Sequence, residues 1–218
     1  MSEKYDQAME LYTHYAEVAD LEKAIALFEQ SGETGAEKYA EKCRTLIEYW
    51  PGNTVTFGRF EGAPIRWKVI DQRGRMRMLL SEKPVTHRAY HGKPTDTSWK
   101  ECDLRQWLNH DFLEAAFTPV ERARITAVRV ENHRNAKYYT NAGLNTMDRA
   151  CVLSVAEAEK YLPEESQRAG DGWWWLRTPG SNLFSAVAVY DDGTIYEFGI
   201  HVHYENGGVR PALWVLLK

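Results

Sequence analysis

Cysteine is scarce in this chain, and its three copies lie far apart. Cys43, Cys102 and Cys151 form no Cys-x-x-Cys pair of the kind that binds zinc or carries out dithiol chemistry. An odd number of widely separated cysteines is also not typical of a disulfide framework. We therefore expect three reduced, mostly buried thiols, as in a cytosolic protein.

Long hydrophobic runs and a leader sequence are also missing. No run of about 18 apolar residues, the length that spans a membrane, occurs in the chain. The first residues, MSEKYDQAMELY, lack the apolar segment of a secretory signal. These absences predict a cytoplasmic protein with no membrane partner, although an exported chain without its signal would have the same pattern.

Neither an excess of positive charge nor a familiar catalytic motif is present. The 27 Lys and Arg residues stand against 31 Asp and Glu residues, so the net charge is −4 and nucleic acid is not expected as a partner. Nucleophile-elbow, P-loop, zinc-protease and dinucleotide-binding motifs are absent. We expect no cofactor, no metal and a binding module more than an enzyme.

Aromatic residues, by contrast, are abundant. They make up 12% of the 218 residues, with eight Trp and twelve Tyr, and suit both mixed cores and surfaces that grip sugar-like groups. In GDGWWWLRTPG, residues 170–180, strand alternation separates Trp174 from Trp173 and Trp175. We expect most of these rings to be architectural and the ring on the minority face, Trp174, to contact a ligand.

Residues 1–49 show helical patterning. Apolar residues recur at helical spacing through Leu21, Ala24 and Phe28, which predicts two or three amphipathic helices. The stretch resembles a tetratricopeptide-type helical hairpin, with Ala24 and Phe28 at its small and aromatic positions. Because fewer than three such repeats form no independent solenoid, we expect this appendage to dock onto the rest of the chain or onto a partner.

The pattern changes at WPGNTV, where Pro, Gly and Asn interrupt the helical spacing. Residues 54–60, 65–71 and 75–81 are then short β-like runs with glycine-containing connections, which predicts a meander. Towards the C-terminus, VAVYDDGTIYEFG predicts a hairpin, because Asp192-Gly193 lies between β-branched and aromatic runs.

Capping motifs predict helices between these strands. In each motif a Ser or Thr precedes a Glu by three residues, and the pairs are Ser98 and Glu101, Thr118 and Glu121, and Ser154 and Glu157. The first pair predicts a helix over residues 99–108, closed by Asn109. Strands followed by helices and further strands indicate an α+β domain with an antiparallel sheet over residues 52–218.

Three ordered motifs in this domain resemble a widespread bacterial domain family of unknown function. That family is marked by a W-x-x-x-x-L-R-x-W-L-N-x-x-F helix, a WWLRSPG-like strand and a GVRPAL-like strand. Here the motifs are matched from Trp99 to Phe112, from Trp174 to Gly180 and from Gly208 to Leu213. The resemblance covers roughly residues 52–218.

Three arginines lie inside these motifs. Arg105, Arg177 and Arg210 are each set among large apolar residues, which favours a structural guanidinium that joins helix to sheet. An anion clamp at Arg177 or Arg210 is the alternative. Trp107 is expected to be part of the core.

The chain's ending is also similar to that of C-type-lectin-like folds, such as the sulfatase-modifying factors. This resemblance implies two or three helices beside a twisted antiparallel sheet whose first and last strands are adjacent. It also implies a ligand surface just before the last strand, over about residues 183–207. The calcium motifs of true C-type lectins are absent, so calcium-dependent sugar binding is not expected.

Aromatic faces and short polar groups near that region suit a glycan or a peptide. The candidate contacts are Trp174, Asn182, Tyr196, His201, His203, Tyr204 and Asn206. His201 and His203 alternate with apolar residues, so both imidazoles should share one face of a strand. Since no third ligand can be named, we interpret them as a polar pocket lining, and not as a metal site.

Three functions remain open at this point. The first is a non-catalytic module that binds a glycan, a peptide or a protein. The second is an enzyme of unknown type that uses His201 or His203 as a base or a metal ligand. The third is a scaffold whose N-terminal helices hold a protein partner. The sequence does not predict the oligomeric state.

Overall fold

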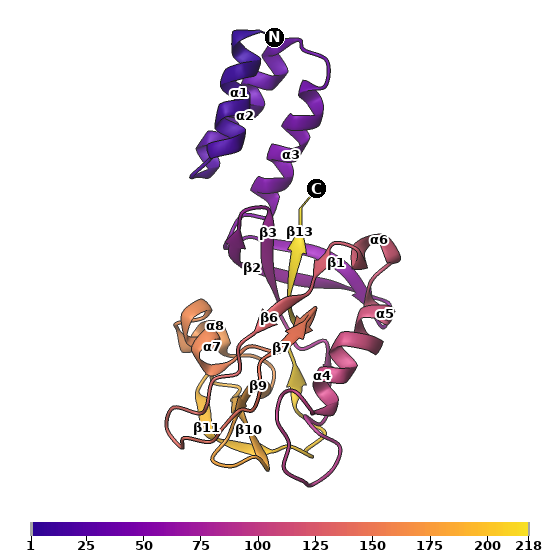
Figure 1. Ribbon diagram of the computed structural model, residues 1–218, viewed down its shortest axis with the longest axis vertical. Coiled ribbons are helices and arrows are strands. Elements are labelled where there is room, and N and C mark those ends of the chain that lie inside the picture. Colours follow the sequence, from indigo (N-terminus) through magenta and orange to yellow (C-terminus); the bar gives the residue numbers. More distant parts are fainter. Residues whose placement is uncertain (1, 218) are drawn as a thin grey trace.

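The computed structural model describes residues 2–217 and consists of a helical arm and an α+β body (Figure 1). The arm, residues 2–49, projects from the body, and its last helix leads directly into the first strand. Within the described residues, no helix combines the length and the apolar character needed to cross a membrane.

The arm contains α1 (Glu3–His14), α2 (Val18–Ser31) and α3 (Ala36–Glu48), which pack in sequence order. Leu21, Ala24 and Phe28 are buried on the inner face of α2, as the helical spacing predicts. The ring of Phe28 contacts Tyr5 of α1 and Tyr39 of α3, with centroids 5.6 and 5.7 Å away. One aromatic side chain therefore joins all three helices.

The arm meets the body through a buried arginine. The side chain of Arg77 is fully buried, and its Nε donates a hydrogen bond of 2.9 Å to the carbonyl of Tyr49. At the same junction the ring of Tyr15 lies 6.1 Å from that of Trp50. The arm is thus attached by specific contacts as well as by the chain itself.

The first sheet begins with the predicted meander. The strands β1 (Thr54–Phe60), β2 (Ala63–Arg73) and β3 (Met76–Ser81) pair antiparallel in that order. The last strand, β13 (Ala212–Leu216), continues the sheet beside β3. The short strands β5 (Ile125–Thr126) and β8 (Ala150–Cys151) both pair with the other edge of β13.

The position of β13 differs from the strand adjacency that the C-type-lectin resemblance implies. The last strand lies between β3 and the short strands, not beside β1. The physical reason is its composition, because Ala212 to Val215 are all buried whereas β1 alternates between exposed and buried residues. A strand that is apolar on both faces is most stable in the centre of a sheet.

The second sheet has the strand order β11 (Ile195–His201), β10 (Ser185–Val189), β9 (Trp174–Pro179), β12 (Gly208–Val209) and β4 (Thr86–His87). Its pairs are antiparallel except for β9 with β12. A separate ribbon pairs β6 (Val128–Val130) with β7 (Thr146–Asp148). With its helices the body is an α+β domain, as predicted.

The central helix departs from the prediction at both ends. It comprises α4 (Asp103–Trp107), the π-helical turn η1 (Leu108–Phe112) and α5 (Leu113–Ala116). The Sγ atom of Cys102, not Ser98, caps it, and Asn109 lies inside it. Asn109 does not close the helix because its amide bonds to β8, donating to the carbonyl of Ala150 at 2.8 Å.

The two other capping motifs are confirmed. Thr118 and Glu121 form a capping box at the start of α6 (Pro119–Arg122), and Ser154 and Glu157 form one at α7 (Val155–Tyr161). The short α8 (Glu165–Arg168) follows, and its backbone lies against the turn between β10 and β11.

Candidate functional site

The predicted hairpin around Asp192-Gly193 is confirmed as β10 and β11. Val189 pairs with Ile195, and the N–H of Gly193 donates to the carbonyl of Tyr190 at 3.0 Å. Further along, the register shifts between the pairs Ala186–Ile200 and Ala188–Tyr196. Three residues of β11 stand there opposite one residue of β10. The hairpin leads the chain to His201 at the end of β11.

Four rings gather there and form what we call the aromatic–histidine cluster: Phe184, His201, His203 and Tyr204. The ring of Phe184 lies 5.0 Å from His201 and 5.7 Å from His203, and that of Tyr204 lies 5.6 and 5.2 Å from the same two imidazoles. A backbone hydrogen bond from Tyr204 N–H to the carbonyl of His201 (3.1 Å) turns the chain so that these side chains meet.

This cluster is open to solvent. Tyr204 is 47% exposed and His201 is exposed as well, whereas His203 and Phe184 are half-buried. The Nδ1 atom of His203 is buried and has no hydrogen-bond partner within residues 2–217. Flat rings can stack on a ligand, and the exposed imidazole of His201 and hydroxyl of Tyr204 can form hydrogen bonds with it.

The two predicted asparagines flank this cluster. Asn182 is exposed, and its Oδ1 accepts a 2.9 Å hydrogen bond from the N–H of Phe184, so it shapes the turn that presents that ring. Asn206 is exposed two residues beyond Tyr204. Glu205, which lies between Tyr204 and Asn206 in the chain, lines a cleft of about 360 Å³ together with His87 and Asp103.

Tyr196 lies in a different group of rings. It stacks on Tyr190 with centroids 5.0 Å apart and contacts Phe198 at 6.1 Å. Phe198 in turn meets Tyr138 of the polar segment after β6, at 5.8 Å. The sequence analysis placed Tyr196 in one set of ligand contacts with His201 and His203. In the structure its ring packs against Tyr190 and Phe198 instead.

Trp174 is buried, contrary to the expectation that it contacts a ligand. It is 1% exposed, its Nε1 donates to the carbonyl of Arg168 at 3.0 Å, and the guanidinium of Arg210 lies 4.6 Å above its ring. Both faces of β9 are covered, since every residue from Trp174 to Pro179 is buried. Of the three consecutive tryptophans only Trp173 is partly exposed, and it packs edge-on against Trp175 at 4.6 Å.

His201 and His203 are neighbours, but two imidazoles alone make an incomplete metal site. The imidazole centroids of His201 and His203 lie 5.8 Å apart. Within residues 2–217, no group of three or more His, Cys, Asp or Glu side chains is close enough to hold a metal ion. All three cysteines are buried thiols, and burial raises the pKa of Cys102 and of Cys151 to about 12.

Arg105 and Arg210 make contacts within the protein. Arg105 forms a 2.7 Å ion pair with the buried carboxylate of Asp148, which also accepts a hydrogen bond from Trp99 Nε1 at 2.9 Å. Arg210 donates to the carbonyl of Ser81 at 3.1 Å. Trp107 is half-buried, and its ring lies beneath the guanidinium of Arg88, with 4.4 Å from Cζ to the ring centroid.

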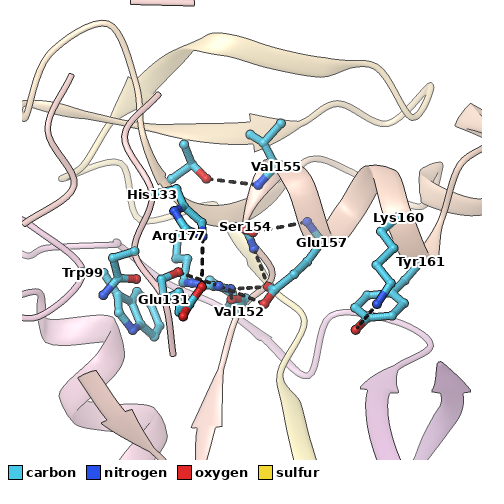
Figure 2. Close-up of polar contacts among 12 residues, drawn as sticks. Trp99, Glu131, His133, Val152, Ser154, Val155, Glu157, Lys160, Tyr161 and Arg177 are labelled. Atoms are coloured by element: carbon cyan, nitrogen blue, oxygen red, sulfur yellow. Dashed lines mark hydrogen bonds and ion pairs between the residues drawn. The ribbon is translucent and has the colours of Figure 1, made fainter. Parts of the chain in front are cut away.

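Arg177 lies in a dense polar network (Figure 2). Its two Nη atoms bond to both carboxylate oxygens of Glu157, and they also donate to the carbonyls of Val152 (2.9 Å) and Glu131 (3.1 Å). The side chain of Arg177 is 3% exposed, and its Nε has no partner within the described residues. Burial lowers the pKa of the Arg177 guanidinium, but the hydrogen bonds and the charge of Glu157 raise it by more. The pKa of Arg177 therefore lies above its ordinary value.

Beside this network lies a cleft of about 510 Å³, which we call the arginine cleft. It runs between α7, β6 and the end of β2, and the basic residues that line it are Arg73, Arg129, His133, Lys160 and Arg177. Figure 2 shows Glu131 and His133 on the side of Arg177 that faces away from Lys160 and Tyr161.

Sequence reasoning missed Phe184 and Glu157 as parts of these sites. Phe184 follows a polar turn and precedes a buried strand, so a partly exposed ring at that position could have been suspected. Glu157 was assigned only to a capping box, and no local pattern reveals that it also binds an arginine 20 residues further along the chain.

Fold and sites together define an α+β domain with a helical arm, an exposed ring cluster and a basic cleft. The chain belongs to the family described as a domain of unknown function (DUF6273), whose model matches residues 75–217. The match includes all the strands of the second sheet and begins after β2. No curated protein matches the chain. No solved structure matches it either.

Proposed function

We propose that the body is a non-catalytic recognition module that binds a glycan through the aromatic–histidine cluster. The observation that carries this proposal is the gathering of Phe184, His201, His203 and Tyr204 in one partly exposed cluster, with a buried imidazole nitrogen that has no partner within residues 2–217. Sugar rings present apolar faces that stack on aromatic rings and hydroxyl groups that bond to polar atoms.

The surroundings of these rings support the same proposal. Glu205 continues the surface into the neighbouring cleft, where Asp103 and His87 supply further polar groups. Small-ligand sites are usually concave and lined by aromatic and apolar side chains, with a few polar groups that orient the ligand. From the C-type-lectin-like resemblance, the proposal retains the ligand surface just before the last strand. The buried thiols suit a reducing compartment, and we propose that the protein acts in the cytoplasm.

A glycan array with the full chain tests this proposal. We expect binding to a subset of glycans, and Tyr204→Ala should weaken it about fivefold or more because a stacked ring contributes about 1 kcal/mol or more. Tyr139→Ala is the matched control, since Tyr139 is 70% exposed and lies outside the cluster; it should bind like the wild type.

Equal binding by Tyr204→Ala and the wild type would contradict the proposal, as would the absence of any bound glycan. If a peptide library selects ligands that depend on Tyr204 while no glycan binds, the ligand is a peptide instead. Turnover of a bound glycan that is lost in His201→Ala or His203→Ala would favour the enzyme hypothesis.

A second candidate function, a protein-interaction scaffold, is favoured by the arm. The three helices pack against one another and project away from the body (Figure 1). Leu11 and Leu27 line an open groove of about 380 Å³ between α1 and α2, together with charged residues. Removal of the arm distinguishes this function from ligand binding by the body.

A further inference from the structure

The arginine cleft is positively charged in a protein that is negatively charged as a whole. Four cationic residues line it, Arg73, Arg129, Lys160 and Arg177, together with two carboxylates, Glu131 and Glu157. Its formal charge is therefore +2 with His133 neutral, whereas the chain carries −4. A concave surface with this charge attracts and concentrates anions.

Two of these cations are not neutralised inside the protein. Arg177 is paired with Glu157, and Lys160 lies 3.7 Å from Asp71. Arg73 and Arg129, by contrast, have no carboxylate of residues 2–217 within ion-pair distance. Their charges are free to act on a ligand.

The guanidinium of Arg73 is held at the cleft by an aromatic ring. Its Cζ lies 4.7 Å above the ring of Trp214, and Trp214 lines a smaller neighbouring pocket that shares Arg73 and Arg129 with the cleft. A guanidinium that stacks on a ring keeps the N–H groups at its edge free to donate. The stacking also reduces the entropy that this side chain would lose when it binds an anion.

Arg177 adds an unsatisfied donor to the same place. Its side chain is 3% exposed and lines the cleft, and its Nε is a buried N–H donor without a partner among residues 2–217. Buried donors are nearly always bonded in folded proteins, so an unpaired one indicates a missing acceptor. An anion in the cleft is an acceptor of the required kind.

We propose that the arginine cleft binds the phosphate group of a small phosphorylated molecule, with Arg73 and Arg129 as the principal contacts. A phosphate monoester carries a charge of about −1.5 to −2 at pH 7, which complements the cleft. Guanidinium groups match phosphate oxygens in geometry and donate two parallel hydrogen bonds. The volume of about 510 Å³ leaves room for a sugar or a similar group attached to the phosphate.

Titration of the ¹⁵N-labelled full chain with inorganic phosphate and with ribose 5-phosphate, followed by NMR, tests this proposal. We expect saturable shifts, including the indole N–H signal of Trp214, with dissociation constants of about 1 mM or below. Arg73→Gln and Arg129→Gln should each weaken binding about tenfold, because each removes a charge-assisted hydrogen bond.

Two controls separate the cleft from general charge effects. Arg75→Gln makes the same charge change two residues from Arg73, at an exposed position that does not line the cleft. Tyr204→Ala alters the aromatic–histidine cluster instead. Both variants should bind phosphate like the wild type.

Three results would overturn the proposal. The first is equal binding by the wild type, Arg73→Gln and Arg129→Gln. The second is the absence of saturable binding up to about 50 mM of either probe, a range far above the millimolar affinity that a single phosphate contact provides. The third is binding of citrate as tight as that of ribose 5-phosphate, since the cleft would then select carboxylates.

Discussion

Arg177 shows how one side chain can join separate segments of the body. It bonds to the carbonyl of Glu131, just after β6, and to the carbonyl of Val152 and the carboxylate of Glu157 in the segment from β8 to α7. Burial disfavours the charged form of Glu157, but the hydrogen bonds and charge of Arg177 outweigh it. The pKa of Glu157 is therefore lower than its ordinary value.

Glu157→Gln should destabilise the protein by about 2 kcal/mol at pH 7. Loss of one partner of a fully buried ion pair costs about 3–5 kcal/mol, and the effect is smaller here because the side chain of Glu157 is 31% exposed. Urea unfolding monitored by tryptophan fluorescence measures the difference. Glu159→Gln is the control, since Glu159 is exposed on the same helix, and it should change stability by less than about 0.5 kcal/mol.

The same pair makes stability depend on pH in a defined direction. Because the pKa of Glu157 is lowered by folding, its contribution is complete above the ordinary value of 4.5 and is lost as the pH falls through the lowered value. The stability difference between the wild type and Glu157→Gln should therefore shrink below about pH 4.5. A constant difference from pH 7 to pH 3 would contradict the assignment.

At the scale of elements, the turn between β10 and β11 depends on Gly193. Its φ angle is +91°, in the region that favours glycine, and a Cβ atom there would collide with the backbone carbonyl of Glu165 in α8. The hairpin thus needs glycine for its conformation and also for the close approach of a neighbouring helix.

Gly193→Ala should lower the free energy of unfolding by more than about 2 kcal/mol, because the strain of a positive φ angle and the collision add up. Gly74→Ala provides the comparison: its φ angle is +55°, but nothing lies within 4 Å of the added Cβ, and a loss of about 1 kcal/mol is expected. If thermal unfolding shows the same loss of stability for both variants, the backbone of α8 moves away from the added Cβ atom without a measurable loss of free energy.

Elements defined by local chemistry were predictable from the sequence, and those defined by distant contacts were not. The Asp192-Gly193 turn and the Ser154 capping box need only neighbouring residues. Asn109, in contrast, was expected to end a helix and lies inside one, because its side chain bonds to the backbone of Arg149 and Ala150. No local pattern contains those partners.

At the scale of the whole molecule, the arm and the body meet at a junction built around Arg77. The fully buried guanidinium bonds to the carbonyl of Tyr49, and Tyr15 adds a ring contact to Trp50. A truncation that retains Tyr49 therefore preserves the acceptor of a buried charge, whereas a cut beyond it leaves Arg77 without this bond.

Deletion of residues 1–48 should leave a body that unfolds cooperatively, with a stability lower by about 1–2 kcal/mol through loss of the contacts of Tyr15. Near-UV circular dichroism and urea unfolding measure this. Tyr15→Ala in the full chain should have a similar effect. If the arm binds a protein partner, the deletion also abolishes partner capture while glycan binding persists. If the deleted protein aggregates or unfolds without cooperativity, the arm is part of the fold of the body.

The expectation of an α+β body with an N-terminal helical region followed from residue order alone, because helical and strand periodicities are local properties of the chain. The ring cluster was only partly foreseen. His201, His203 and Tyr204 are close in sequence, whereas Trp174 was expected to contact a ligand and is buried.

Burial and the meeting of distant residues depend on how the elements pack, and packing is a property of the whole chain. Strand alternation separated Trp174 from its neighbours, but only the packing of the folded body determined that the residues on both faces of β9 are buried. The arginine cleft has the same origin. Arg73, Arg129 and Lys160 lie up to 87 positions apart in sequence, and only the folded body places them around one cleft.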